Sequence, residues 1–176
     1  MKDISRERTF HLISEINEQV LAGFADWLRD CYCNDRVSPV KLIISSTGGL
    51  SGVSTAMREL VRSVYPVPMY SIAVGYVASA AVPVFLSGTT RYITEKTELM
   101  VHSVARRIEQ GRAVPLTEYA RMTERMTGHQ QEYGTYLVER CNGKLPVALL
   151  ETWLKDERYI SATEALQYGF AHHMLM

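Results

Sequence analysis

The sequence is poor in the residues that mark several classes of protein. It has three cysteines in 176 residues, Cys31, Cys33 and Cys141, and this odd, sparse set does not predict a disulfide framework. Their spacing matches no paired metal-ligand motif, so we expect no metal and no cofactor. Lysine plus arginine and aspartate plus glutamate both number 19. A nucleic-acid binder normally carries excess positive charge, and we therefore expect no nucleic-acid partner.

Charge is absent from one long internal stretch. Residues 63–90 carry no charged side chain, and such a length is sufficient to cross a bilayer as a helix. Pro66, Pro68, Gly75 and Pro83 interrupt the stretch, which favours a buried strand followed by a buried helix over a membrane segment. The charged N-terminal residues "MKDISRERTF" also lack the apolar core of a signal peptide. We expect a cytoplasmic protein with no membrane partner.

Segments with strand and helix patterns alternate along the chain. Apolar or β-branched runs predict strands at 9–14, 40–45, 69–75, 91–94, 98–102 and 170–176. Helical periodicity predicts helices after Asn17, after the glycine-rich stretch 46–52, at 78–86 and at 116–140. Ser161 and Glu164 predict a capping box, and Gly169 predicts the end of that helix. The alternation indicates an α/β fold with parallel crossovers, in one domain of residues 1–176.

Three short stretches are candidates for chemistry. The first is "STGGLSG" (46–52), whose glycines allow a sharp turn with exposed N–H groups that can hold an anion. The second is "GYVASAAV" (75–82), where Ser79 follows a predicted strand. The third is "LMVHSV" (99–104), where His102 ends a predicted strand. In such α/β folds, functional residues usually collect at the carboxyl ends of strands.

Each stretch also has a purely structural interpretation. The glycines are compatible with a plain tight turn, Ser79 with a packed core serine, and His102 with a histidine bonded to a backbone carbonyl. The functional interpretation gains weight if Ser79 and His102 meet, because a serine needs a base to become nucleophilic near neutral pH. A carboxylate would then orient the imidazole.

Together these pieces resemble the Clp protease proteolytic subunit, a serine peptidase family. The carrying motifs are the Gly-Gly of "IISSTGGLSG", "GYVASAA", "MVH" and "ERYISATEALQYGF", and the resemblance runs from Thr9 to Leu175. It implies an α/β fold of ClpP/crotonase-like repeated ββα units with a long protruding handle helix at 116–140. It also implies a homo-oligomeric ring, heptamer or tetradecamer, that cuts peptides or unfolded polypeptides, and it allows an AAA+ unfoldase as partner.

The resemblance assigns roles to individual residues. Ser79 matches the nucleophile and His102 the general base, and Gly49 and Ala80 match the residues whose N–H groups form the oxyanion hole. It also implies that peptides bind as an added strand beside the residues after Gly49 and the segment 106–114.

The position of the third catalytic residue departs from the family motif. The family has an aspartate directly before an Arg-Phe-Leu-Ser-Ala stretch, whereas this chain has Glu157 before "RYISA". Glu157 is therefore the predicted acid, and the alternatives are that the neighbouring Asp156 orients His102 or that neither residue does. Thr47 stands where the family usually has proline, Ser103-Val104 replace its Gln-Pro, and the segment before the first strand is shorter.

Four functions remain in competition. A serine-type endopeptidase is favoured. A catalytically inactive ring or peptide-binding subunit is supported by the glutamate at position 157. An acyl-CoA enzyme of the same fold would use the glycine-rich oxyanion hole without a Ser-His pair. A Ser-Lys hydrolase would need a lysine near the serine, and the nearest candidate is Lys96 in a predicted turn.

Overall fold

The structure is a computed structural model that describes residues 5–105 and 113–175. Across these ranges, seven strands form one sheet in the order β1-β2-β3-β4-β7, with β5 added to β3 and β6 added to β5. The strands are β1 (Thr9–Leu12), β2 (Val40–Ser46), β3 (Met69–Ala78), β4 (Thr90–Thr94), β5 (Glu98–Val101), β6 (Arg158–Ser161) and β7 (His173–Leu175). The β5–β6 pair is antiparallel and the other pairs are parallel. The predicted α/β class is confirmed.

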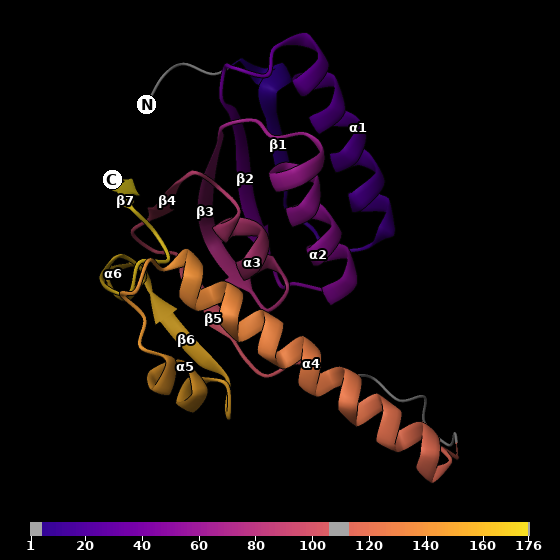
Figure 1. The fold of residues 1–176 in the computed structure, drawn as a ribbon. Helices are drawn as coiled ribbons and strands as arrows, with labels where there is room; N and C mark the ends of the chain where they lie inside the picture. The colour runs from indigo at the N-terminus through magenta and orange to yellow at the C-terminus, as the bar shows by residue number, and fades with distance from the viewer. Residues whose placement is uncertain (1–4, 106–112, 176) are drawn as a thin grey trace.

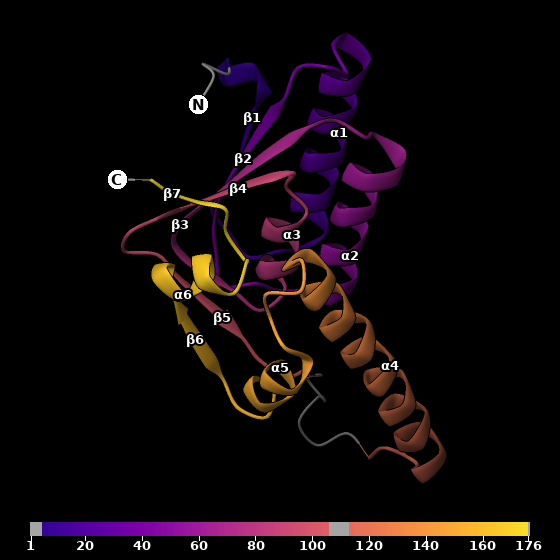
Figure 2. The same cartoon turned by 60° about the vertical axis from the view of Figure 1, so that its left-hand side comes forward.

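The helices lie between and beside these strands. They are η1 (Arg6–Arg8), α1 (Glu18–Asn34), α2 (Ser51–Glu59), η2 (Leu60–Val64), α3 (Ala81–Leu86), α4 (Leu116–Arg140), α5 (Val147–Trp153) and α6 (Ala162–Gln167). Helices α1 and α2 run along one face of the sheet, and α4 projects away from the body (Figures 1 and 2). The α4 bounds agree with the predicted helix 116–140, and the stretch 158–161 and helix α5 were not predicted.

The core lies between the sheet and the helices on that face. Phe24 and Leu28 of α1 and Met57 of α2 are fully buried, as are Leu42 and Ile44 of β2. Burying an apolar side chain of this size stabilises the fold by roughly 1.5–3 kcal/mol. The alternation along β2, in which every second residue is buried, shows that the helices cover one face of the sheet.

Local signals in the sequence explain several element ends. The Asn17 side chain accepts a hydrogen bond from the Val20 N–H at 2.9 Å and so starts α1. Ser161 and Glu164 form the expected capping box at the start of α6. Gly169, two residues beyond α6, has a φ of 79°, the left-handed conformation that glycine adopts easily at a helix end.

Strand β3 changes partner along its length, and this places its end. Residues Tyr70 to Ala73 pair with β4, and Tyr76 to Ala78 pair with β5. The register against β2 shifts between Ile44 and Ser46. The prediction ended this strand at residue 75 and began the next helix at 78, which is wrong. The extra pairs with β5 carry the strand on to Ala78, and α3 begins at Ala81.

Two arginines join the base of α4 to the sheet. The fully buried Arg91 donates to the carbonyls of Phe170, Arg140 and Gly169 at 2.7, 2.8 and 3.0 Å. Arg140, the last residue of α4, donates to the Leu86 carbonyl at 2.7 Å. Burial lowers the pKa of Arg91 to about 10. Carbonyl oxygens thus take the role that a carboxylate usually plays for a buried cation.

Much of the uncharged stretch 63–90 is buried, above all residues 77–88. It forms the end of η2, strand β3 and helix α3, as the interruptions by proline and glycine indicated. Among the residues that the structure describes, no helix has the length and apolar character needed to cross a membrane.

Candidate active site

Ser79 lies directly after β3 in a strained turn. Its φ is 54°, a left-handed conformation that non-glycine residues rarely adopt and that tends to occur at functional sites. Its N–H donates to the Met100 carbonyl at 2.8 Å, so β5 holds the backbone of Ser79 in place. The turn separates the buried strand from α3 and brings the hydroxyl to the carboxyl end of the sheet.

His102 lies directly after β5, beside Ser79. Parallel pairing of Ala78 with Met100 places the carboxyl ends of β3 and β5 side by side. The His102 Nε2 lies 2.7 Å from the Ser79 Oγ, within the reach of a nucleophile and its base. The structure thus brings together two predicted residues that are 23 positions apart in the chain.

The glycine-rich loop packs against the Ser79 turn. A Cβ added at Gly48 would lie 2.8 Å from the Ala78 carbonyl oxygen and 3.0 Å from the Ala80 nitrogen. Gly48 and Gly49 have φ values of 98° and 146°, which only glycine adopts without strain. Within the described residues, neither the Gly49 N–H nor the Ala80 N–H donates a hydrogen bond. Such free N–H groups are available to an anion.

Two further serines support this loop, and the sequence interpretation missed them. The Ser46 hydroxyl donates to the Ser14 carbonyl at 2.6 Å and accepts from the Gly48 N–H at 3.2 Å. The buried Ser54 hydroxyl of α2 donates to the Ala80 carbonyl at 2.7 Å. These bonds fix the peptide groups on both sides of the site. Small polar residues before and after the glycines were the available signal.

The predicted acid, Glu157, precedes β6 on the far side of β5. Antiparallel pairing of Val101 with Arg158 makes Glu157 the next residue opposite His102. Its Oε2 instead accepts a hydrogen bond from the Tyr159 hydroxyl at 3.3 Å. In the ranges that the structure describes, no hydrogen bond joins His102 to Glu157 or to the exposed Asp156. The structure therefore shows a Ser-His pair with a carboxylate nearby but bound elsewhere.

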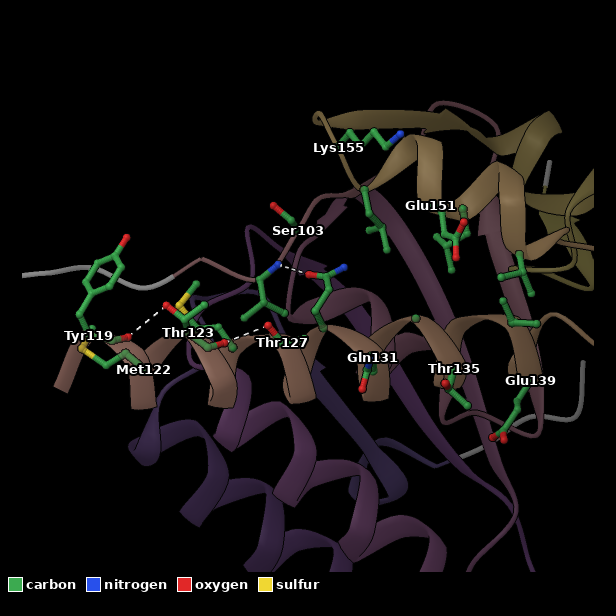
Figure 3. Close-up of a pocket in the computed structure, with 18 residues that line it drawn as sticks. Ser103, Tyr119, Met122, Thr123, Thr127, Gln131, Thr135, Glu139, Glu151 and Lys155 are labelled. Atoms are coloured by element: carbon green, nitrogen blue, oxygen red, sulfur yellow. Dashed lines mark hydrogen bonds between the residues drawn. The ribbon is translucent and has the colours of Figure 1, made fainter. Parts of the chain in front are cut away.

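A cavity lies between α4 and α5, next to the chain that leaves His102. It has a volume of about 960 Å³, and its lining includes Ser103, Val104 and the apolar residues Met122, Met126, Val138, Leu150 and Leu154. The Val104 N–H donates to Gln130 Oε1 on α4 at 2.6 Å, a contact that the sequence did not predict. Figure 3 shows Ser103 on one side of the cavity and Thr127 and Gln131 on α4. The predicted peptide-binding segment 106–114 lies mostly outside the described residues.

Other candidate nucleophiles and bases lie in unsuitable surroundings. Burial raises the pKa of the Cys141 thiol to about 12, so this thiol is not an activated nucleophile. Lys96 has a side chain that is 91% exposed and a Nζ that lies 3.9 Å from Glu95 Oε1. The Ser79 hydroxyl already bonds His102, which disfavours the Ser-Lys alternative.

Comparisons with known proteins bear on the fold and the family of this chain. The solved structure of a ClpP1 mutant from Listeria monocytogenes superposes with a TM-score of 0.82 at 18% identity, over 96% of this chain and 91% of that chain. This likeness shows the fold.

A curated relative extends the comparison to the sequence. It is "ATP-dependent Clp protease proteolytic subunit 4, chloroplastic" of Arabidopsis thaliana, 29% identical over 169 residues. The match covers 93% of this chain and 54% of the relative, so the chain spans about half of that protein's length. The sequence pattern of the Clp protease family matches residues 1–176. The chain therefore belongs to the Clp protease family.

Proposed function

We propose that this protein is a serine-type endopeptidase with Ser79 as nucleophile and His102 as general base. The observation that carries the proposal is the 2.7 Å contact between Ser79 Oγ and His102 Nε2 at the carboxyl ends of two adjacent strands. The strained φ of Ser79 supports it, because such strain persists mainly where the surroundings demand it. Family membership supplies the reaction class.

The reaction in this proposal is acyl transfer in two steps. His102 Nε2 removes the hydroxyl proton as Ser79 Oγ attacks the peptide carbonyl carbon, and the protonated imidazole then gives that proton to the leaving amine. Water hydrolyses the acyl-enzyme by the same path, with His102 again as base. Glu157 is the proposed third residue, which would accept a hydrogen bond from His102 Nδ1 and stabilise the imidazolium.

The oxyanion of the tetrahedral intermediate is assigned to the N–H groups of Gly49 and Ala80. The support is their position on either side of the Gly48–Ser79 contact and their lack of partners among the described residues. Each such donor contributes about 3 kcal/mol to transition-state stabilisation. The lining of the cavity between α4 and α5 begins at Ser103, the residue after His102, which suits the cavity to hold an apolar substrate side chain.

Assembly and partners extend the same proposal. The projecting helix α4 exposes Leu116 and Tyr119, which are 84% and 56% exposed, and such apolar residues on a long arm suit packing against other subunits. We assign the protein to a homo-oligomeric ring, heptamer or tetradecamer, that acts on peptides or unfolded polypeptides in the cytoplasm. An AAA+ unfoldase is the matching partner for folded substrates.

The test is hydrolysis of a set of fluorogenic peptides by purified wild-type protein and by Ser79→Ala. We expect turnover by the wild type and a loss of at least about 10³-fold in the variant, because the nucleophile is removed. Mass spectrometry of a cleaved longer peptide identifies internal cuts. Equal rates for both proteins would exclude Ser79 as nucleophile, and size-exclusion chromatography checks that both assemble alike.

One observation favours a second function, an inactive ring or peptide-binding subunit. Glu157 bonds Tyr159 rather than His102, so the acid of the proposed triad is turned away. Under this alternative the wild type binds peptides without turnover, and Ser79→Ala leaves peptide binding unchanged.

A further inference from the structure

Three side chains share one face of the sheet beside the Ser79 turn. Residues that alternate along a strand point to the same side, and so do directly paired residues on neighbouring strands. Met100 pairs with Tyr159, which places Tyr159, Glu157 and His102 on a common face. Val101 and Ile160 belong to the opposite, fully buried face. Glu157 therefore stands between two neighbours on its own side, Tyr159 and His102.

The Tyr159 hydroxyl bonds the carboxylate that would otherwise orient His102. It donates to Glu157 Oε2 at 3.3 Å. The glutamate side chain is one methylene longer than the aspartate that the family motif has at this position. That motif also has phenylalanine where this chain has Tyr159. The Tyr159 hydroxyl and the longer Glu157 side chain are thus both departures of this chain from the family motif.

The ring of Tyr159 is itself held in position. It stacks on Tyr76 of β3 with the ring centroids 6.4 Å apart and the planes at 25°. Burial raises the pKa of Tyr76 to about 12, with a hydrogen bond to Tyr159 as the next cause. The stack keeps the Tyr159 hydroxyl beside Glu157.

We infer that Tyr159 is a positioning residue that withholds Glu157 from His102 and so keeps the Ser-His pair without its acid. This inference rests on the proposed function, because it assigns a control to the same site. The withholding contact is the single hydrogen bond between these two exposed residues.

The experiment uses the purified, assembled protein and five variants, one of which, His102→Gln, serves only to assign a spectrum. Tyr159→Phe removes the hydroxyl and keeps the ring that stacks on Tyr76. Glu157→Gln and the double variant show whether an effect passes through the carboxylate. Tyr70→Phe is the matched control, because Tyr70 lies on the same strand as Tyr76 and its ring packs on Tyr92 at 6.1 Å, away from Glu157.

Two readouts are measured on each protein. The first is kcat and KM for one fluorogenic peptide. The second is the low-field proton NMR signal of an imidazole N–H bonded to a carboxylate, assigned with His102→Gln. We expect Tyr159→Phe to raise kcat about tenfold or more with little change in KM, and to make the low-field signal appear. The double variant should lose both gains, and Tyr70→Phe should match the wild type.

Each result decides the inference. An unchanged or lower kcat together with an unchanged spectrum in Tyr159→Phe would overturn it, and so would a gain that survives in the double variant. If no variant hydrolyses any peptide, the proposed function fails, and the spectrum alone decides whether Tyr159 withholds Glu157.

Discussion

The two sides of the candidate site are held in place by very different means. Ser79 and His102 follow two strands in the interior of the sheet, and their backbones are tied together by the bond from the Ser79 N–H to the Met100 carbonyl. Glu157 precedes β6, which in the described residues pairs only with β5, and it is exposed. The core thus fixes Ser79 and His102, the proposed nucleophile and base, whereas the exposed Glu157 carboxylate is held by a single hydrogen bond to Tyr159. The control that we propose for Tyr159 acts on Glu157, the less constrained of these two sides.

The largest expected effect comes from a change in the glycine-rich loop that packs against the Ser79 turn. Gly48→Ala places a Cβ 2.8 Å from Ser79 Cβ and from the Ala78 carbonyl oxygen, at a φ of 98°. The turn must shift, and a displacement of about 1 Å at a nucleophile lowers the rate on the order of 10²-fold. Thermal unfolding and peptide hydrolysis measure the effect, and we expect losses in both.

Gly52→Ala is the control for that prediction. Gly52 lies in α2, and an added Cβ there meets nothing within 4 Å. Alanine in a helix interior stabilises by about 0.5–1 kcal/mol relative to glycine. A Gly48→Ala protein that is as active as Gly52→Ala would show that the loop does not support the Ser79 turn.

The second prediction concerns the partner of the Glu157 carboxylate, which is either Tyr159 or His102. In a triad whose acid already serves the histidine, replacing that acid by its amide lowers kcat by about 10⁴-fold. Because Glu157 is bonded to Tyr159, we expect Glu157→Gln in the wild-type background to lower kcat less than about tenfold. Steady-state kinetics on one peptide measure it, with Asp156→Asn as the neighbouring control. A loss near 10⁴-fold would mean that the assembled protein already has a complete triad.

The third prediction has the smallest expected effect and concerns His172, which lies outside the candidate site. His172 Nδ1 accepts from the Arg91 N–H at 3.2 Å, and burial, followed by the charge of Arg91, lowers the pKa of His172 to about 4. The unfolded chain binds this proton first, so stability is full above about pH 6.5 and is lost as the pH falls toward 4. The burial of His172 is only partial, and because the residue keeps much of its surface in water, the loss stays below about 1 kcal/mol after screening.

Melting temperatures between pH 7 and 4.5 test this prediction. We expect His172→Asn to lose less stability on acidification than the wild type, while its specific activity at pH 7 is unchanged. His129→Asn on α4 is the control, because that histidine is exposed on the projecting arm. An identical acid dependence of His172→Asn and the wild type would contradict the assignment.

The sequence predicted the parts of the fold that are encoded locally. The periodicity of 116–140, the cap at Asn17 and the capping box at Ser161 were all confirmed, because each depends on residues within a few positions. The true end of β3 depends on pairing with β5, and periodicity alone does not show such pairing. Helix α5 was missed because its seven residues are too few for a periodic signal.

In the candidate site, too, the sequence predicted what residue types encode and missed what depends on long-range pairing. The residue types of Ser79, His102 and the two glycines marked them as candidates, and the strand ends then brought them together. The contact of Glu157 with Tyr159 depends on register across β5 and β6 and on a side-chain conformation. A single sequence carries no signal for that choice.

The central claim, that Ser79 is activated by His102, is tested most directly by labelling the assembled protein with a fluorophosphonate probe and measuring its intact mass. The account predicts one adduct per chain in the wild type and none in Ser79→Ala, with a greatly slowed reaction in His102→Gln. A folded, assembled wild-type protein that gains no adduct would contradict it, and so would an adduct that persists in Ser79→Ala.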